Sequence, residues 1–365
     1  MLQRFVRLCE IPSPTGNERA VADAVLGELR DLGIEVEEDG AAGPARAGAG
    51  NLIARVPGQK EGWVMLAAHL DTVPHEEPIE VSFEDGAFRS RGDTILGADD
   101  KAAVTVLVEL AARHAKSPPA AGLELVFTVA EEDGLRGAKE LDLDALRAPF
   151  GFVLDHASPI GDVITAAPTH KRLRADFEGS EAHAGIRPEA GRSAIAAAAA
   201  AIAQMKLGRL DEATTANVGV IAGGTASNVV PGHCRLEAEA RSLDDERASN
   251  AIGAMVDACT WAAGENECDV DVAVDEVFRG YRLRSSAAPI ALARAAMSRC
   301  GIEPREIATG GGSDANAFCA AGFECALLAN GTEGNHTPAE SVAAERIVQM
   351  LEVCEALVTE VAGAC

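Results

Sequence analysis

The chain has 365 residues and a hydrophobic fraction of 47%, so it is long enough for two or three domains with buried cores. Its formal net charge of -25 and sequence pI near 4.7 make binding to nucleic acid or to anionic membranes unfavourable. Its nine cysteines are odd in number and contain no CxxC pair, which argues against a disulfide framework or a zinc knuckle.

Three features of the sequence indicate the cellular location of the protein. Residues 1–7 contain no long apolar stretch of the kind found in signal peptides. No uninterrupted apolar run reaches membrane-spanning length. Cysteines that stay free fit a reducing compartment. We therefore expect a cytoplasmic protein that contacts neither membranes nor nucleic acid.

The first part of the chain predicts two helices and three strands of an α/β sheet. The second helix carries Val21, Val25 and Leu29 on one face, and Gly33 marks its end. The predicted segments are a short opening helix, a helix at 17–32, and strands at 34–38, 51–56 and 63–70.

Two polar residues stand at the end of the apolar run 63–70. His69 and Asp71 are two residues apart, so their side chains point to the same side. This pair suits an imidazole that binds a metal while a carboxylate holds its second nitrogen. A core histidine with a local hydrogen bond and a turn aspartate explain the same pattern, and at this point both interpretations stay open.

Acidic residues stand at the ends of three further elements. Asp99 and Asp100 begin a helix predicted to reach residue 115, where one aspartate would satisfy the N-terminal N–H groups. The second aspartate therefore needs another explanation. The other acids follow predicted strands: Glu131 and Glu132 after 122–130, and Asp155 after 150–154.

Residues 168–281 have a different pattern from the segments that flank them. Their predicted β-α-β-β-α-β order resembles a ferredoxin-like unit. We therefore predict an inserted α+β domain at 168–281, with connections near 167 and 282. Segments 1–167 and 282–365 would then form one discontinuous domain.

The last part of the chain returns to the first pattern. Helices are predicted at 286–300 and 341–361, with a buried strand at 324–329 between them. A glycine-rich loop at 310–316 lacks the lysine and the spacing of a P-loop, so we reject nucleotide binding there. His336 lies in the loop that follows the strand.

Six residues suited to bind metal are predicted to meet at one edge of the sheet. Each alone has a structural explanation as a cap, a turn, a surface charge or a core histidine, but ligands of open α/β sheets bind at the carboxyl ends of strands. Two histidines with several carboxylates suit zinc, cobalt or manganese, and so many acids need a cation between them. The six are His69, Asp99, Glu131, Glu132, Asp155 and His336.

Two metal ions fit this set more economically than one. One carboxylate can bridge them, and each ion then takes one histidine and one further carboxylate. Adjacent residues at a strand end point to opposite sides, so we expect Glu131 and Glu132 not to bind the same ion. A carboxylate left free beside the metals is suited to act as a general base.

The sequence resembles the M20 family of metallopeptidases, especially its peptidase T-like branch. The matching motifs run in family order and cover nearly the whole chain. They are residues 11–18, 69–74, 97–101, 131–134, 183–185 and 310–316, and His336. The resemblance implies an α/β zinc-peptidase-like catalytic domain with a mixed, mostly parallel sheet flanked by helices, and an inserted α+β ferredoxin-like lid or dimerisation domain.

The resemblance also implies a role for each matching residue of the catalytic domain. Asp99 would bridge two zinc ions, Asp71 would orient His69, and Glu131 would be the general acid and base. The implied ligands are His69, Asp99 and Asp155 for one zinc, and Asp99, Glu132 and His336 for the other.

In the lid, the resemblance implies that His183 stabilises the tetrahedral oxyanion, often from a partner subunit in a homodimer. Asn228 and Arg241 match positions that hold a substrate carboxylate, and arginine suits that geometry. A structural role remains open for all three. Backbone amides of three residues are expected to line the substrate site: Gly311, Gly312 and Ser313.

We therefore expect a di-zinc metallopeptidase that hydrolyses short peptides, as a tripeptidase or aminopeptidase does. An N-acyl amino acid deacylase is the alternative with the same chemistry. A non-catalytic metal- or peptide-binding protein is disfavoured because Glu131 and all the expected ligands are present. His75 and His156 adjoin the motifs but are not expected to be ligands, although His156 stands where a small residue is expected.

Overall fold

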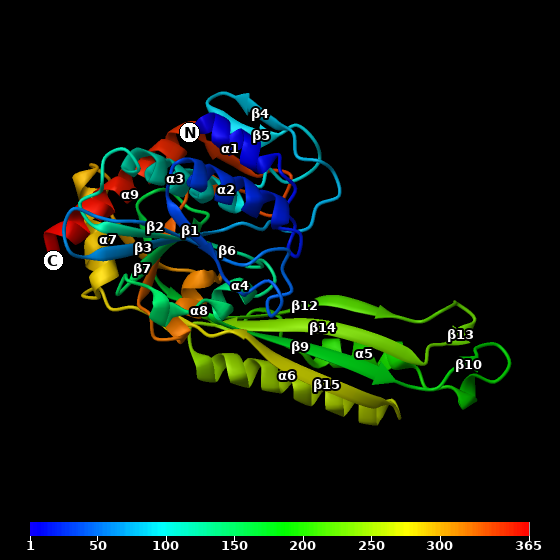
Figure 1. Cartoon of the computed structure of the whole chain (residues 1–365). Coiled ribbons are helices and arrows are strands. Elements are labelled where there is room, and N and C mark those ends of the chain that lie inside the picture. Colours follow the sequence, from blue (N-terminus) through cyan, green and yellow to red (C-terminus); the bar gives the residue numbers. More distant parts are fainter. Residues whose placement is uncertain (365) are drawn as a thin grey trace. The chain divides into compact units, whose positions relative to one another are not determined.

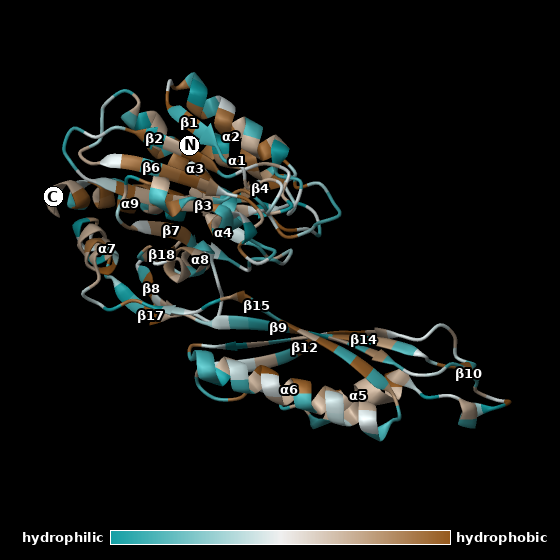
Figure 2. Ribbon diagram, turned by 60° about the horizontal axis from the view of Figure 1, so that its bottom comes forward, coloured by the Kyte–Doolittle hydropathy of each residue, from teal (hydrophilic) through white to brown (hydrophobic). Residues whose placement is uncertain are grey.

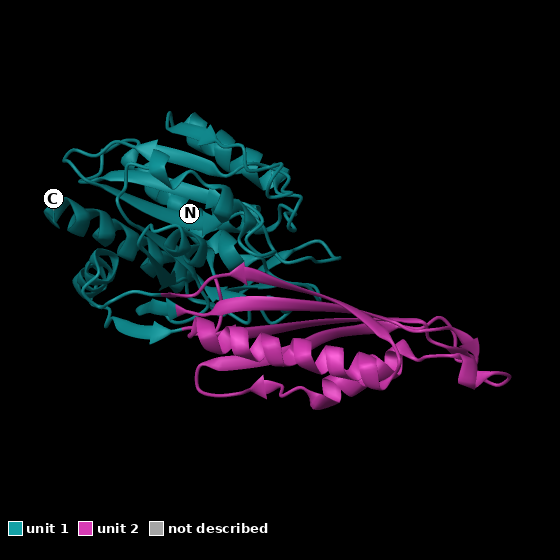
Figure 3. Ribbon diagram, turned by 90° about the horizontal axis from the view of Figure 1, so that it is seen from below, with its two compact units in different colours: residues 1–166, 282–308, 313–365 teal, residues 167–281, 309–312 magenta. Residues whose placement is uncertain are grey.

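The structure is a computed structural model that describes residues 1–364, and it divides into two compact units. The second unit comprises Ala167–Tyr281 together with Thr309–Gly312, and the first comprises the rest of the described chain (Figure 3). The first unit is discontinuous in sequence, because the chain leaves it after Ala166 and returns to it at Arg282.

A mixed nine-stranded sheet forms the centre of the first unit (Figure 1). Its strand order is β1-β2-β6-β3-β7-β18-β8-β16, and β17 pairs with β8. The α/β class predicted from the sequence is therefore confirmed. The strands are β1 (Glu35–Glu38), β2 (Leu52–Val56), β3 (Trp63–His69), β6 (Gly122–Thr128), β7 (Gly151–His156), β8 (Asp162–Ala167), β16 (Tyr281–Arg282), β17 (Arg305–Ala308) and β18 (Cys325–Ala329).

Helices cover this sheet, and α3 and α9 pack on β3 while α8 packs on β7 and β18. They are α1 (Leu2–Cys9), α2 (Arg19–Asp31), α3 (Ala98–His114), α4 (Arg136–Glu140), η1 (Leu143–Ala145, a short 3-10 helix), α7 (Ala288–Arg299), α8 (Asp314–Ala320) and α9 (Ala344–Ala364).

Strand β3 is buried on both of its faces. Leu66 and Ala68 belong to the main hydrophobic core, whereas Met65 and Ala67 point to the other side of the sheet and are equally inaccessible. The central strands are correspondingly hydrophobic (Figure 2). Burial on both faces is the reason that this strand reads as a continuous apolar run.

A small four-stranded sheet, in the order β19-β20-β5-β4, lies beside the main one in the first unit. It joins the β4–β5 hairpin to the loop that carries His336, because β20 pairs with β5. Its strands are β4 (Val81–Glu84), β5 (Ala87–Ser90), β19 (Thr332–Glu333) and β20 (Ser341–Ala343).

Three strands of the main sheet were not predicted, namely β8, β17 and the two-residue strand β16. Strand β8 is a short run that contains two alanines and ends before Pro168, and β17 is largely exposed, so neither has a clear apolar pattern. The strand predicted at 150–154 extends to His156, where it pairs with Ala329 of β18. Asp155 therefore lies within β7 and not after it.

The second unit contains a five-stranded antiparallel sheet in the order β11-β12-β14-β9-β15, with α5 and α6 packed on it (Figure 1). Alternate residues of β9, such as Leu173 and Phe177, are buried against the alanine-rich α5. The elements are β9 (Thr169–Glu178), β10 (Ala182–His183), η2 (Pro188–Ala190), α5 (Ala194–Gln204), β11 (Gly208–Arg209), β12 (Thr214–Gly223), β13 (Val229–Val230), β14 (His233–Ser242), α6 (Asp245–Glu265) and β15 (Asp269–Phe278).

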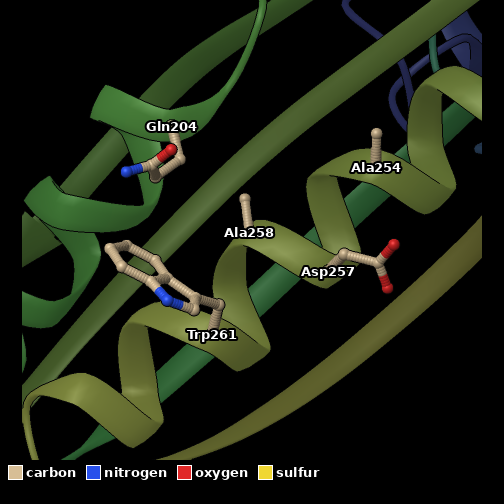
Figure 4. A pocket seen from close by; sticks show the side chains of 5 residues that line it. All are labelled: Gln204, Ala254, Asp257, Ala258 and Trp261. Carbon is tan, nitrogen blue, oxygen red and sulfur yellow. The ribbon is translucent and has the colours of Figure 1, made fainter.

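A hollow of about 460 Å³ lies on the helical side of the second unit. Gln204 of α5 and Trp261 of α6 border it (Figure 4). Its other lining residues, Ala254, Asp257 and Ala258, also belong to α6 and include no predicted site residue.

Within residues 1–364, none of the helices combines the length and the apolar character that a membrane span requires.

Candidate metal centre

The five predicted metal ligands and the predicted general base Glu131 meet near the carboxyl ends of three neighbouring strands. Strand β3 pairs in parallel with β6 on one side and with β7 on the other, so their carboxyl ends share one edge of the sheet. The six come from five places: His69 ends β3, Glu131 and Glu132 follow β6, Asp155 lies in β7, Asp99 lies at the start of α3, and His336 lies between β19 and β20.

Asp99 lies between the two histidines. Its Oδ1 is 3.3 Å from His69 Nε2, and its Oδ2 is 3.1 Å from His336 Nε2. Asp155 Oδ1 lies 3.6 Å from His69 Nε2, and Glu132 Oε1 lies 3.1 Å from His336 Nε2. Each histidine therefore faces one oxygen of Asp99 and one further carboxylate.

Three sets of three side chains place one potential ligand atom each within 4.8 Å of one another. The first and the third set share only Asp99, and each contains one histidine. The sets are His69, Asp99 and Asp155; His69, Glu131 and Glu132; and Asp99, Glu132 and His336.

The second of these sets differs from the arrangement expected for adjacent residues at a strand end. We expected Glu131 and Glu132 to point to opposite sides, but both approach His69. Strand β6 ends at Thr128, and Ala130 has a positive φ of 51°. The chain thus turns before the two glutamates, and the alternation of a strand no longer governs their side chains.

Burial and mutual repulsion dominate the electrostatics of the carboxylates. Burial raises the pKa of Glu131 well above its ordinary value, and the neighbouring Asp155 raises it further. Burial likewise raises the pKa of Asp155, with Asp99 adding to the effect. Such a group of buried acids is held together most easily by cations.

The two histidines respond in the opposite direction. Burial would lower the pKa of His69, but the neighbouring carboxylates of Asp155, Asp71 and Asp99 outweigh it and raise this pKa well above its ordinary value. Hydrogen bonding to Asp99 and Glu132 raises the pKa of His336 to about 10. Positive charge is therefore strongly favoured in this cluster.

The donor set fits two divalent metal ions. Imidazole nitrogens and carboxylate oxygens are the ligands that zinc, cobalt and manganese take in proteins. Glu132 Oε1 is buried and lies 3.1 Å from His336 Nε2. Asp99 Oδ2 lies equally close to this imidazole nitrogen, and the convergence of two carboxylate oxygens on one nitrogen supports a metal at the position between Asp99, Glu132 and His336.

Asp71 contacts His69 mainly through its backbone. His69 Nδ1 lies 3.0 Å from the Asp71 carbonyl oxygen but 3.6 Å from carboxylate Oδ1. The carboxylate accepts hydrogen bonds from the backbone N–H groups of Glu131 at 3.0 Å and Glu132 at 3.2 Å, and from the Thr15 hydroxyl at 2.7 Å. The sequence did not predict these partners of the Asp71 carboxylate, two of which lie on the turn that carries Glu131 and Glu132.

Two further buried polar residues near the centre were also missed. Lys101 is fully buried and donates to Ser13 Oγ at 2.6 Å, and Ser13 Oγ donates to the Leu70 carbonyl at 3.0 Å. Glu340 is buried and accepts hydrogen bonds from the segment before Asp99. The only sequence signal for either was proximity to a motif, because their partners are distant in the chain.

The predicted lid residues lie in the second unit, and two of them are neighbours. His183 pairs with Val229 between β10 and β13, and the Ala184 N–H donates to the Asn228 carbonyl at 2.9 Å. His183 and Asn228 thus lie on adjoining segments, and both are exposed.

Arg241 is separated from these two residues. It lies near the opposite end of β14 from His233, a distance of about 26 Å at the usual rise per residue. Its guanidinium makes two hydrogen bonds to Glu239, from Nε and Nη2, each at 3.1 Å. A role of Arg241 in holding a substrate carboxylate with Asn228 therefore stays a prediction.

The glycine-rich loop already uses two of the backbone amides that were expected to face substrate. The Gly311 N–H donates to Thr309 Oγ1 at 3.1 Å, and the Ser313 N–H donates to Asn316 Oδ1 at 3.2 Å. A Cβ on Gly312 would lie 2.2 Å from the Phe278 ring, so only glycine fits there. A role of Gly311, Gly312 and Ser313 in substrate binding stays a prediction.

The two histidines that were not expected to be ligands are in none of the three candidate sets. His75 Nδ1 lies 3.3 Å from the Val73 carbonyl oxygen. His156 Nδ1 lies 2.9 Å from Ser158 Oγ, and burial lowers the pKa of this histidine. Local contacts therefore account for both side chains.

Comparison with known proteins gives a consistent result. The model of peptidase family M20/M25/M40 matches residues 65–360. The solved structure of aminopeptidase PepT from Bacillus cereus is 37% identical, covers 99% of this chain and 98% of its own, and superposes with a TM-score of 0.86. A tripeptidase from Staphylococcus aureus is 34% identical, with the same coverage and a TM-score of 0.91. The uncharacterised protein YqjE of Bacillus subtilis is 36% identical over 99% of this chain and 98% of its own.

Proposed function

The chain belongs to peptidase family M20/M25/M40 and is a metal-dependent hydrolase, and we propose that it is a di-zinc aminopeptidase acting on short peptides such as tripeptides. The observation that carries the proposal is the position of Asp99, which two sets of potential ligands share. Similarity to an aminopeptidase and a tripeptidase over nearly the whole chain supports the choice of substrate.

The proposed ligands follow the two sets that share Asp99. His69, Asp99 and Asp155 would hold one zinc ion, and Asp99, Glu132 and His336 would hold the other. When bound, these ions would polarise the scissile carbonyl and lower the pKa of the attacking water. Glu131 would take the water proton on a carboxylate oxygen and deliver it to the nitrogen of the leaving amine.

The lid residues would act on the substrate itself. His183 would donate a hydrogen bond to the oxyanion that forms during attack, and Asn228 and Arg241 would bind polar ends of the peptide. The separation of Arg241 from the other two supports a homodimer in which two subunits complete one site. The cysteines among residues 1–364 are all free, which supports a cytoplasmic location.

A substrate panel with metal analysis tests this proposal. We expect two zinc ions per chain, cleavage of an unmodified tripeptide, and loss of cleavage after chelation with recovery on adding zinc. The same tripeptide with an acetylated N-terminus should not be cleaved, because an aminopeptidase requires the free amine. Two zinc ions with cleavage of N-acyl amino acids alone would move the assignment to a deacylase, and no bound metal would reject it.

Substitution of Asp71 tests the contacts made by its carboxylate. We expect Asp71→Asn to lower kcat about 10- to 100-fold, because the amide replaces one of the two oxygens that hold the Glu131 and Glu132 N–H groups. Zinc content should not change, since His69 Nδ1 contacts the backbone carbonyl of Asp71.

Asp142→Asn is the matched control, because Asp142 is an exposed aspartate that accepts a backbone N–H from Asp144 at 3.1 Å. Its kinetics should equal those of the wild type. Loss of one zinc ion from Asp71→Asn would instead mean that the carboxylate acts on His69.

A further inference from the structure

Glu340 is a buried carboxylate that the proposed mechanism does not use. Its side chain is 1% exposed, and it follows His336 by four positions in the chain. Both of its oxygens accept backbone hydrogen bonds from a segment more than two hundred residues earlier. Oε2 accepts from Leu96 N and Gly97 N, and Oε1 accepts from Asp99 N, all at 2.8 Å.

The segment that Glu340 binds has N–H groups in need of an acceptor. Asp99 and Asp100 have non-helical backbone angles at the start of α3, with ψ values of 102° and 33°, and Gly97 has a positive φ of 70°. The N–H groups at the beginning of a helix have no partner within it. In a buried segment such groups must find another acceptor, and a carboxylate is a strong one.

Glu340 is equally fixed on its own side. Its N–H donates to the Thr337 carbonyl at 3.0 Å, and Thr337 Oγ1 donates to the Gly334 carbonyl at 2.7 Å. His336 lies inside this hydrogen-bonded turn and has a positive φ of 65°. The turn that carries His336 therefore ends at Glu340, and the side chain of Glu340 binds the backbone N–H of Asp99.

We propose that Glu340 is a positioning residue that sets the distance between Asp99 and His336. It thereby fixes the metal affinity of the position between Asp99, Glu132 and His336, called here the second metal position. It connects the backbones of the two residues, whose side chains lie 3.1 Å apart. The inference rests on the proposed function, because it assumes that these side chains share a metal ion. A hydrogen bond to the backbone of a metal ligand holds that ligand in place before the metal arrives.

Two variants of Glu340 and a matched control test the inference. Glu340→Gln removes the charge and one acceptor oxygen, and Glu340→Asp keeps the charge but shortens the side chain by one methylene. Glu124→Gln is the control, since Glu124 is also fully buried and accepts the N–H groups of Arg147 and Ala148 at 2.6 Å and 2.8 Å. Glu124 lies near the amino end of β6, away from the metal centre.

The readout is zinc affinity of the folded, metal-free protein, measured by competition with a chelating indicator, together with its melting temperature. We expect both Glu340 variants to bind the second zinc ion about 10- to 100-fold more weakly, and Glu124→Gln to lower the melting temperature without a change in zinc affinity.

Wild-type affinity for both zinc ions in folded Glu340 variants would overturn the inference and leave the proposed function intact. Equal weakening in Glu124→Gln would also overturn it, since general destabilisation would then explain the effect. A wild-type protein that binds no zinc would reject the proposed function and this inference with it. Glu340→Asp decides the question in the same way if Glu340→Gln does not fold.

Discussion

Glu131→Gln is expected to lower kcat for tripeptide hydrolysis by about 10²- to 10⁴-fold while the protein keeps two zinc ions. The amide has nearly the same shape as the carboxylate but cannot take a proton from the attacking water. The buried position of Glu131 beside Asp155 raises its pKa, which suits a group that must also release the proton to the leaving amine.

Zinc content decides between two roles for Glu131. Glu131 also belongs to a potential ligand set with His69 and Glu132, so a ligand role predicts loss of metal from the same variant. Asp133→Asn is the control, because Asp133 lies in the same turn, is exposed and forms an ion pair with Arg136. Its activity should match the wild type. A Glu131→Gln protein with nearly full activity would contradict the assignment as general base.

Asp99→Asn is expected to weaken both metal positions at once. Asp99 is the only residue common to the first and the third ligand set, and an asparagine offers a single oxygen that cannot bridge. The loss of zinc affinity should exceed the roughly 100-fold that results from changing residues that only support the ligands, because a direct ligand is removed. Elemental analysis after dialysis should find little or no zinc, and activity should be lost with it.

Two companion variants make this prediction specific. Asp155→Asn and His336→Gln each alter one ligand set only, so each should keep one zinc ion per chain. Zinc content should therefore be highest in the wild type, intermediate in Asp155→Asn and His336→Gln, and lowest in Asp99→Asn. Two tightly held zinc ions in Asp99→Asn would show that Asp99 does not bridge.

The ligand positions could be predicted because each one interrupts or ends a recognisable pattern. His69 terminates an apolar strand that is buried on both faces, and Asp155 follows the apolar residues of β7. Strand ends in a parallel arrangement share an edge, so their side chains could be placed together without coordinates. The same reasoning predicted the α/β class of the first unit.

The contacts that support the ligands could not be predicted in this way. The hydrogen bonds that the N–H groups of Leu96, Gly97 and Asp99 donate to Glu340 join residues 241 to 244 positions apart, and no local pattern marks such a pair. The positive φ of Ala130 redirects Glu131 and Glu132, yet alanine gives no sequence signal for a left-handed conformation. Arg241 and Glu239 lie two residues apart on one face of β14, but no sequence pattern showed that the guanidinium binds Glu239.

The strand order of the first unit has a consequence for how the protein is made. Strand β18 lies between β7 and β8 in the sheet, although nearly the whole second unit lies between β8 and β18 in the sequence. During synthesis, Ala167–Tyr281 is therefore complete before the central sheet can close. At ribosomal rates the open edge of β7 waits on the order of ten seconds for its neighbour. The segment of the inserted unit is thus synthesised before the first unit is complete, and the proposed metal ligands can meet only near the end of translation, when His336 has been made.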